Sequence, residues 1–363
     1  MRILVAIHRY VGLALALLLM VIALSGGLLL WADEYHQLRF SELRHEGPEP
    51  EVKPAALDAA LQAAASPVGT IAMPREGLPA ITLYYRNGAQ SFHSAQDGSS
   101  ISEWLPLESV YSFLFELHVH LLSGEIGHLV TGFAALLLIA MIIIGFVLWW
   151  RKRRIFHLTK WRPKGTRTHE LLSSHAAQGT IAGLVMLLVL LTGAGMVFHE
   201  PTEALLKKIP GSVQQTRPGA VEIERDSEEI NWAAVLAAAR TSFPNAAVRM
   251  LMLPNSPHEP INIRLKQPEE LHPNGRSYLS LHPLTGEVLA RIDATQTGPG
   301  PSLYNLIYPL HSGKTGWPGY RLLLFIAALA SVYLAVSGFW VYLRRAATRK
   351  RNRAFTKRGH PGR

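Results

Sequence analysis

The chain has 363 residues, of which 48% are hydrophobic and 17% charged, with 36 basic and 26 acidic side chains. This balance excludes an ordinary soluble domain and indicates membrane-spanning segments. Cysteine is absent, which excludes disulfides and the attachment of a c-type haem through a Cys-x-x-Cys-His motif.

Four stretches without Asp, Glu, Lys, Arg or His are the expected membrane spans. Each has about 21–23 residues, enough to cross a hydrocarbon core of about 30 Å at about 1.5 Å per residue. The basic start and first apolar run resemble a signal peptide, but the run is long and no small-x-small site follows it, so we expect a retained helix. The spans are Val11–Trp31, Leu129–Trp150, Ala176–Phe198 and Leu322–Leu343.

Basic residues are concentrated between the second and third spans and after the fourth. Segment 151–174 has eight Lys or Arg and one acid, the tail 344–363 has nine and no acid, and Arg2 and Arg9 precede the first span. The positive-inside rule therefore predicts a multi-pass inner-membrane protein with both termini in the cytoplasm. The outer segments then have a net charge of −8, so the overall +10 does not indicate nucleic-acid binding. We expect the basic tail to contact anionic membrane lipid.

The two long outer segments each have the pattern of a small α+β module. An alanine-rich stretch predicts a helix in each, and alternating runs separated by Asn-Gly predict strands joined by tight turns. The expected helices are Ala55–Ala65 and Trp232–Arg240, and the expected strands are Ile81–Arg86, Gln90–His93, Ile261–Lys266 and Ser277–His282.

Four histidines recur at matching positions in the two halves of the chain. His8 and His175 are each followed by glycines after four and 18 residues, and His118 and His311 each lie 27 residues before a glycine. The pattern predicts a two-fold parallel repeat, whose axis along the membrane normal brings His8 opposite His175 and His118 opposite His311. The glycines concerned are Gly12, Gly26, Gly179, Gly193, Gly145 and Gly338.

Paired histidines on facing helices are typical axial ligands of a b-type haem, and glycines on one helical face leave room for the flat macrocycle. We therefore expect two non-covalent b-type haems, one held by His8 and His175 and one by His118 and His311. Glycine stripes also arise from close helix packing, and arginine at a membrane edge often only snorkels. Residues expected to contact the haems or their propionates are Gly12, Gly26, Gly179, Gly193, Arg9, Arg321 and Lys314.

Other histidines are weaker candidates. His120 and His128 flank His118, and either is an alternative outer ligand or a partner for a propionate. His199, at the end of the third span, is a third alternative. The chain has no Gly-x-Gly-x-x-Gly, Walker or His-Glu-x-x-His motif, so we expect an unidentified cytoplasmic or membrane electron donor.

No cluster in the outer segments has the pattern of a substrate pocket. Candidate aromatic contacts exist, but core packing or interfacial anchoring explains each of them more simply. They are Tyr84, Tyr85, Trp104 and Trp317.

The order of these motifs resembles the PepSY-associated transmembrane family over nearly the whole chain. The motifs are His8-Arg9-Tyr10-Val11-Gly12, Ser25-Gly26, Leu117-His118, Leu121-Leu122-Ser123-Gly124, Gly145-Phe146 ahead of Trp149-Trp150-Arg151, His175-x-x-x-Gly179, Thr192-Gly193 and Leu310-His311-Ser312-Gly313. Within the family the chain is similar to the di-haem inner-membrane ferrisiderophore reductases. That similarity implies four membrane helices, two PepSY-like periplasmic modules, two b haems and reduction of a ferric siderophore, with release of Fe(II) for iron uptake.

Two other functions fit the same pattern. One is a cytochrome b electron-transfer subunit for a partner oxidoreductase or quinol. The other is a haem-free membrane anchor whose PepSY-like modules bind peptides or a protease.

The expected fold is an α-helical integral membrane protein with four transmembrane helices in a two-fold parallel repeat. Its expected segments are a first membrane helix at 1–31, a PepSY-like module at 32–108, an outer segment and second helix at 109–150, a basic cytoplasmic loop at 151–174, a third helix at 175–198, a second module at 199–301, an outer segment and fourth helix at 302–343, and a basic cytoplasmic tail at 344–363.

Overall fold

A computed structural model describes residues 1–44, 47–155, 157–213, 223 and 229–358, with side chains as far as residue 351. Parts of the second module and the last five residues of the basic tail therefore lie outside the described residues. The chain forms two compact units. The first contains Met1–Leu30, Leu114–Phe198 and Trp317–Arg363, and the second contains Trp31–Phe113 and His199–Gly316.

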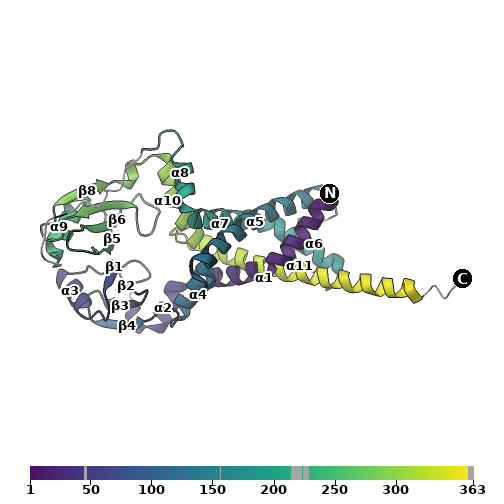
Figure 1. Cartoon of the computed structure of the whole chain (residues 1–363), viewed down its shortest axis with the longest axis horizontal. Helices are drawn as coiled ribbons and strands as arrows, with labels where there is room; N and C mark the ends of the chain where they lie inside the picture. Colours follow the sequence, from purple (N-terminus) through teal and green to yellow (C-terminus); the bar gives the residue numbers. More distant parts are fainter. Residues whose placement is uncertain (45–46, 156, 214–222, 224–228, 359–363) are drawn as a thin grey trace. The chain divides into compact units, whose positions relative to one another are not determined.

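The first unit is a bundle of long apolar helices, and Figure 1 shows α11 extending beyond the other helices at its C-terminal end. Helices α1 (Arg2–Leu29), α5 (Gly124–Lys152) and α11 (Pro318–Arg358) are each long and apolar enough to cross a membrane. Helices α6 (Thr168–Ile181) and α7 (Gly183–Val197) together form a further apolar segment, bent by 56°. The described residues thus contain three spanning helices, or four spans when the bent pair is one, and the chain is a membrane protein.

The third expected span, Ala176–Phe198, is not one straight helix. It breaks at Ala182, between α6 and α7. Counted from His8 and His175, the position that matches Gly183 in the first half is Ala16, which lies inside the unbroken helix α1. Glycine has a lower helix propensity than alanine, so a bend costs less at Gly183 than at Ala16. The sequence repeat therefore does not extend to the local shape of these two spans.

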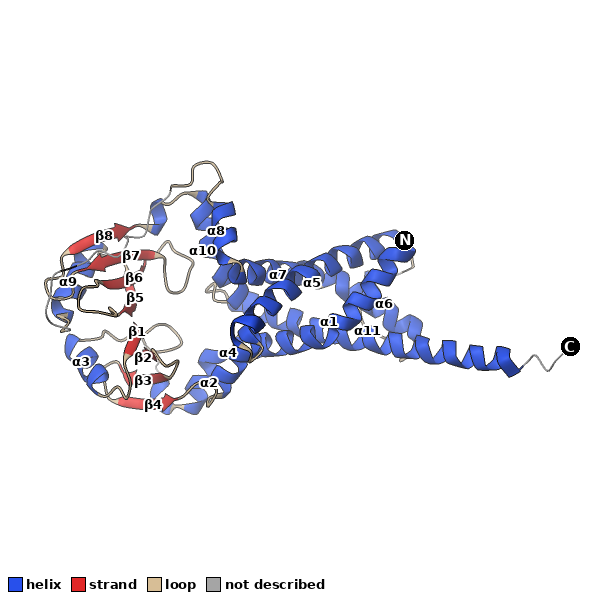
Figure 2. Ribbon diagram, in the orientation of Figure 1, coloured by secondary structure: helices blue, strands red, loops and turns tan. Residues whose placement is uncertain are grey.

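The second unit contains one antiparallel sheet of eight strands among the described residues (Figure 2), in the order β4-β3-β2-β1-β5-β6-β7-β8. The strands are β1 (Val68–Ala72), β2 (Ala80–Tyr85), β3 (Gln90–Ser94), β4 (Ser100–Trp104), β5 (Ala247–Met252), β6 (Ile261–Lys266), β7 (Ser277–Leu281) and β8 (Val288–Ile292). Strands β1 and β5 pair antiparallel, with Ile71 opposite Leu251. The two modules, expected as separate α+β units, therefore share one continuous sheet.

The second unit also contains several helices. One further helix begins in the second unit and ends in the first. Those of the second unit are α2 (Ala32–Arg39), α3 (Pro54–Gln62), α8 (His199–Leu206), α9 (Trp232–Ser242) and α10 (Pro299–Ser312), and α4 (Val110–His120) crosses the boundary between the units. Short 3-10 helices occur at Ser41–Leu43, Leu158–Lys160 and Ala294–Gln296.

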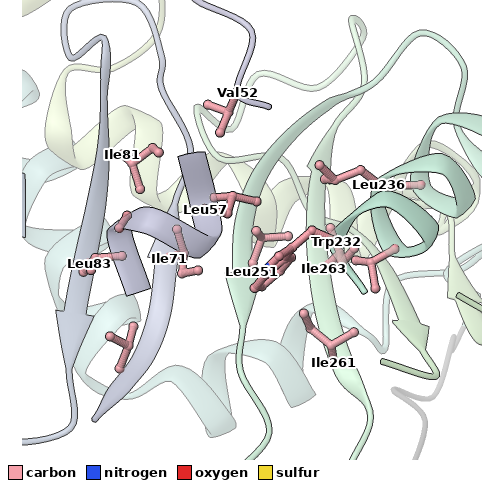
Figure 3. Packing of buried hydrophobic residues seen from close by; sticks show 14 of the residues in the cluster. Val52, Leu57, Ile71, Ile81, Leu83, Trp232, Leu236, Leu251, Ile261 and Ile263 are labelled. Carbon is pink, nitrogen blue, oxygen red and sulfur yellow. The ribbon is translucent and has the colours of Figure 1, made fainter. Parts of the chain in front are cut away.

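One face of the sheet is covered by α3 and α9, as the close view in Figure 3 shows. Side chains alternate along each strand, so Ile261 and Ile263 are fully buried against these helices while Arg264 lies on the opposite face. Leu57 of α3 and Trp232 of α9 belong to the same apolar cluster. A single core therefore stabilises both modules together.

The helices expected at Ala55–Ala65 and Trp232–Arg240 correspond to α3 and α9, and the four expected strands correspond to β2, β3, β6 and β7. The alternating runs do not include β1 or β5, the strands that join the modules. Strand β1 contains Gly69, and its register with β2 shifts between Val68 and Thr70, so its apolar residues do not alternate regularly.

Candidate functional site

The first unit contains a cavity of about 630 Å³ near the N-terminal end of α1. Its walls are mostly apolar side chains of α1, α5, α6, α7 and α11, and two histidines line it, His8 from α1 and His175 from α6. Cofactor sites are typically apolar clefts of about 300–1,000 Å³ with a few polar groups. The cavity therefore has the size and chemistry of a cofactor site.

The two histidine rings lie opposite each other. Their centroids are 6.3 Å apart and their planes are at 88°. A metal–imidazole bond is about 2 Å long and the nitrogen lies about 1 Å from the ring centre, so two imidazoles on opposite sides of one iron have centroids about 6 Å apart. The observed separation fits axial ligation of a haem iron by both residues.

Ser337 of α11 orients the ring of His175. Nδ1 of His175 lies 2.9 Å from the Ser337 hydroxyl, which donates its proton to the backbone carbonyl of Leu334 at 3.3 Å. The Nδ1–H tautomer of His175 satisfies both contacts, because the hydroxyl then accepts from Nδ1 and the lone pair of the ring is on Nε2. A neutral imidazole in this tautomer is ready to bind a metal.

His8 has no equivalent hydroxyl partner. Its Nδ1 faces the backbone of Met141 but is buried without a well-formed hydrogen bond among the described residues. A buried polar nitrogen of this kind costs about 1–3 kcal/mol of stability. His8 therefore lacks the side-chain partner that orients His175.

Each histidine of this pair packs against a glycine of a neighbouring helix. A Cβ added to Gly145 of α5 would lie 3.1 Å from Cε1 of His8, and one added to Gly338 of α11 would lie 3.5 Å from Cε1 of His175. From the sequence, these glycines serve only as markers of the repeat. The structure gives them a role, because both glycines lie against a histidine ring. A Cβ at position 145 would press on the ring of His8, whereas one at position 338 would make an ordinary van der Waals contact with His175.

The remaining predicted residues of the inner site line the same cavity. Gly12 and Gly179 are among its walls, and Arg9 is one of several basic residues around it. No acidic side chain is among the described lining residues. The cavity can therefore take a flat apolar group that has anionic substituents. The other basic residues, which the sequence reasoning did not single out, are Lys152, Arg345, Arg349 and Lys350.

His118, on α4, packs against α1. Its Nδ1 lies 3.0 Å from the carbonyl of Ile22 and 3.3 Å from the hydroxyl of Ser25. A Cβ added to Gly26 would lie 2.6 Å from Cε1 of the ring. Donation to Ile22 again puts the lone pair on Nε2. Gly26 therefore leaves room for the ring of His118. This contact explains a glycine here by itself, whereas the spacing predicted that the glycine makes room for a macrocycle.

A small polar residue before the glycine is a signal that connects these contacts. Ser25-Gly26 receives His118 and Ser337-Gly338 receives His175, with the serine near Nδ1 and the glycine beneath Cε1 in both. Where His8 packs on Gly145, the preceding residue is Ile144, which explains its unpartnered Nδ1. From the sequence, Ser25-Gly26 and Thr192-Gly193 serve only as family motifs. The structure adds that a Ser-Gly pair can receive a histidine ring from another helix.

The predicted residues of the outer site are distributed over both units. His311 is on α10 and His199 begins α8, both in the second unit, so the pairing of His118 with His311 remains a prediction. Gly193 and Arg321 lie on α7 and α11 and are not among the described lining of the cavity. Nζ of Lys314 lies 3.6 Å from a carboxylate oxygen of Asp33, and its expected contact with a propionate remains a prediction.

The alternative outer ligands lie close to each other. Nδ1 of His120 is hydrogen-bonded to a carboxylate oxygen of Glu116 at 2.9 Å, and the ring centroid of His120 lies 5.4 Å from that of His128. Nδ1 of His128 is buried without a hydrogen-bond partner among the described residues. Within the described part of the chain, no group of three or more His, Asp or Glu is arranged to hold a metal ion. A haem iron with two axial histidines needs no such group.

Two of the four candidate aromatic residues are part of the core of the second unit. Tyr85 is buried and hydrogen-bonds to Ser91 at 2.8 Å, and Trp104 is buried among aromatic rings. Tyr84 and Trp317 are 38% and 64% exposed. The simpler explanation therefore holds for Tyr85 and Trp104.

The sequence pattern of the PepSY-associated TM region matches residues 5–345 of this chain. The chain belongs to the PepSY-associated transmembrane family. The family match covers the helices around the cavity and all eight strands of the described sheet. Comparison with curated proteins gives no match.

Proposed function

We propose that this family member is an inner-membrane reductase that uses two b-type haems to pass electrons to a ferric siderophore in the periplasm. The observation that supports it most directly is the 6.3 Å separation of the His8 and His175 rings inside an apolar cavity. When bound, each haem would supply one-electron transfer through an iron that alternates between Fe(III) and Fe(II).

In this proposal the residues of the cavity bind and orient the inner haem. His8 and His175 ligate the iron, and Ser337 fixes the tautomer of His175. Gly145 and Gly338 leave space for the rings. The apolar walls exclude water, which tunes the potential, and basic residues such as Arg9 neutralise the propionates.

His118 and His311 are proposed to hold the outer haem. His118 contacts Gly26, which lies 18 residues along α1 from His8, or about 27 Å at 1.5 Å per residue. That distance is most of a hydrocarbon core of about 30 Å. Two haem sites in opposite leaflets would therefore let electrons cross the membrane within one chain.

The remaining parts of the proposal follow from charge and iron chemistry. Both termini are proposed to be cytoplasmic, so electrons from an unidentified cytoplasmic or membrane donor enter at the inner site. Siderophores bind Fe(III) far more tightly than Fe(II), so one electron delivered to the ferric chelate releases the metal. No general acid or base is needed.

The first test is the spectrum and haem content of the purified chain. We expect a Soret band and a reducible α band, with His8→Ala or His175→Ala losing about half of the haem because one of two bis-histidine sites is destroyed. His169→Ala is the matched control, because His169 is exposed on the same helix as His175 and does not line the cavity. Full haem content with an unchanged spectrum in His8→Ala would show that these are not the ligands.

The second test follows reoxidation of the dithionite-reduced protein by stopped-flow absorbance. A ferric siderophore should reoxidise the parent chain, and His118→Ala or His311→Ala should abolish this while the inner haem still accepts electrons. Reoxidation by quinone and not by the chelate would favour the cytochrome b subunit. Absence of any haem spectrum would favour the PepSY-type peptide- or protease-binding anchor.

A further inference from the structure

The face of the sheet opposite α3 and α9 carries polar and aromatic side chains. Arg264 of β6 lies on it, between Met250 of β5 and Tyr278 of β7 in the strand register. Tyr84 of β2 is on the same face, because its neighbour Leu83 points into the core. This face therefore differs in chemistry from the apolar face.

One face of α10 contacts basic residues of the second module. Tyr304, Tyr308 and His311 are spaced by four and three residues, which places them on one helical face. The guanidinium carbon of Arg276 lies 5.7 Å from the ring centre of Tyr304. The ring of His272 stacks on Tyr308, with centroids 5.1 Å apart and planes at 22°. The same face thus leads from Arg276 to the proposed haem ligand His311.

His272 links this helix face to the sheet. Nη2 of Arg264 lies 3.2 Å from Nε2 of His272. Burial, together with the charges of Arg264 and Arg276, lowers the pKa of His272 to about 2. The imidazole is therefore neutral at physiological pH, and it adds no charge while it holds an arginine beside Tyr308.

A second basic group completes the surface. Arg75 makes two hydrogen bonds to Asp33, at 2.7 and 2.8 Å, and Lys314, just after α10, lies 3.6 Å from the same carboxylate. Tyr84 and Tyr308 lie within electrostatic range of Arg75. Tyr84 is 38% exposed, so part of its phenol ring is accessible on this face.

The balance of charge at this surface is positive. Arg75, Lys314, Arg264 and Arg276 face two carboxylates, Asp33 and Glu270. Glu270 accepts hydrogen bonds from the backbone N–H groups of Gln267 and Arg276, and burial raises its pKa. Nε of Arg276 is buried without a hydrogen-bond partner, and its side chain forms no ion pair with any residue of the described ranges. The outer segments as a whole are expected to have a net negative charge. The excess of positive charge at this surface is therefore a local feature.

We propose that Arg264, Arg276, Tyr304 and Tyr308 form the docking surface for an anionic ferric chelate of the tricatecholate class. Guanidinium groups bind anionic oxygens in charge-assisted pairs, and phenol rings stack on catecholate rings. The surface selects against neutral and cationic hydroxamate chelates, which do not offset its net positive charge. This inference rests on the proposed reductase function, because it assigns that reaction its substrate class.

The test measures binding separately from electron transfer, with the full chain in detergent and redox-silent gallium(III) complexes. The trianionic complex of a hexadentate tricatecholate should quench intrinsic tryptophan fluorescence with an affinity that falls as salt is raised. Arg276→Gln should weaken its binding roughly tenfold, the value of one charge-assisted hydrogen bond. The neutral complex of a hexadentate trihydroxamate should bind more weakly and be unaffected by the substitution.

Arg291→Gln is the matched control. Arg291 also lies over an aromatic ring, Phe243 at 4.3 Å, but it is paired with Leu279 in the sheet register and so lies on the face that α9 covers. This variant should bind the tricatecholate complex like the parent. Equal loss in Arg276→Gln and Arg291→Gln would overturn the proposal, because the effect would then come from overall charge.

Reoxidation of the reduced chain by the matching ferric complexes separates the two proposals. If the gallium tricatecholate binds through Arg276 and the ferric form does not reoxidise the chain, the docking surface stands and the reductase proposal fails. If the ferric trihydroxamate reoxidises the chain as fast as the tricatecholate, and Arg276→Gln alters neither rate, the reductase proposal stands and the docking surface fails.

Discussion

At the scale of single residues, the histidines of the membrane bundle are positioned by two neighbours, a glycine beneath the ring and a hydroxyl beside Nδ1. Ser337-Gly338 supplies both for His175, and Ser25-Gly26 supplies both for His118. His8 has only the glycine. A hydroxyl that accepts from Nδ1 raises the basicity of the ligating nitrogen and so stabilises the oxidised state of a bound iron.

The missing hydroxyl gives a first prediction. Ile144→Ser should place a hydroxyl beside Nδ1 of His8 and lower the midpoint potential of the inner haem, whereas Ser337→Ala should raise it, each by roughly 20–60 mV if the bond is worth about 1 kcal/mol. Spectroscopic redox titration of the purified chain measures both shifts.

Ser331→Ala is the control for this pair, since Ser331 is buried in the same helix as Ser337 and bonds only to the Ala327 carbonyl in the described residues. The midpoint potential of the inner haem in Ser331→Ala should equal that of the parent chain. Shifts of the same sign in Ile144→Ser and Ser337→Ala would contradict the role assigned to the hydroxyl.

A second residue-scale prediction concerns His36 in the second unit. Its ring is buried, stacked on Trp104 with centroids 6.0 Å apart, and its Nδ1 has no hydrogen-bond partner among the described residues. Burial lowers the pKa of His36 to about 4, despite the opposing charge of Asp33. An unfolded chain has a histidine pKa of about 6.5, so it binds more protons than the folded chain between about pH 4 and 6.5. Stability is therefore present above this window and is lost as the pH falls through it.

His36→Phe keeps an aromatic ring in the cluster and removes the titrating group. The dependence of the unfolding free energy on pH between about 4 and 6.5 should then decrease by the contribution of about one proton, or about 1.4 kcal/mol per pH unit. Denaturant unfolding followed by tryptophan fluorescence measures it. Phe92→Leu, which loosens the same cluster without removing a titrating group, should lower stability and keep the slope. An unchanged slope in His36→Phe would show that His36 is not the source.

At the scale of elements, the bend between α6 and α7 is the clearest difference between the two halves. It lies seven residues after His175 and so sets the direction in which α6 presents that ring. Gly183 begins α7 with a right-handed backbone, and a Cβ added there would meet only the side chain of Ile142, at 3.6 Å. The site therefore has room for alanine.

Gly183→Ala should stabilise the chain by about 0.5–1 kcal/mol, because alanine loses less backbone entropy than glycine in a helix. A rise in the midpoint of thermal unfolding in detergent, with unchanged haem content, would agree with this. Gly145→Ala provides the contrast, since its Cβ would lie 3.1 Å from Cε1 of His8, and it should lose haem without gaining stability. A fall in stability for Gly183→Ala would mean that the bend itself requires glycine.

At the scale of the whole molecule, charge and hydropathy are expected to set the orientation. The cavity with His8 and His175 lies next to the basic segments, and its lining includes Lys152, Arg345 and Arg349. If those segments are cytoplasmic, this proposed haem site is the proposed entry point for electrons and the sheet is in the periplasm. The assignment of inner and outer roles to the two histidine pairs depends entirely on this orientation.

Reporter fusions test the orientation directly. A fusion after Arg363 should be active only with a cytoplasmic reporter, and an insertion within residues 60–70 only with a periplasmic one, because of the positive-inside distribution of Lys and Arg. Neutralising the basic residues of segment 151–174 should weaken this preference. A periplasmic C-terminus would reverse the direction of electron flow that we propose.

The sequence by itself determined the apolar spans, the repeat of histidines and glycines, and membership of the family. These could be predicted because each depends on local composition or on fixed spacing along the chain. The spans at Val11–Trp31 and Leu129–Trp150 correspond to α1 and α5, and His8, His175, Gly12 and Gly179 were all named from their spacing before the cavity placed them together.

Only the tertiary structure decided which distant segments meet. The two modules join through β1 and β5, where Ile71 pairs with Leu251, 180 residues later. Gly145 of α5 packs against His8 of α1, and Nζ of Lys314 lies 3.6 Å from a carboxylate oxygen of Asp33. None of these contacts leaves a pattern in the linear sequence, because a short strand, a glycine or a lysine has the same local signature whichever partner it finds. Packing selects the partner, since burial of apolar surface and the pairing of polar groups are satisfied only when the whole chain has folded.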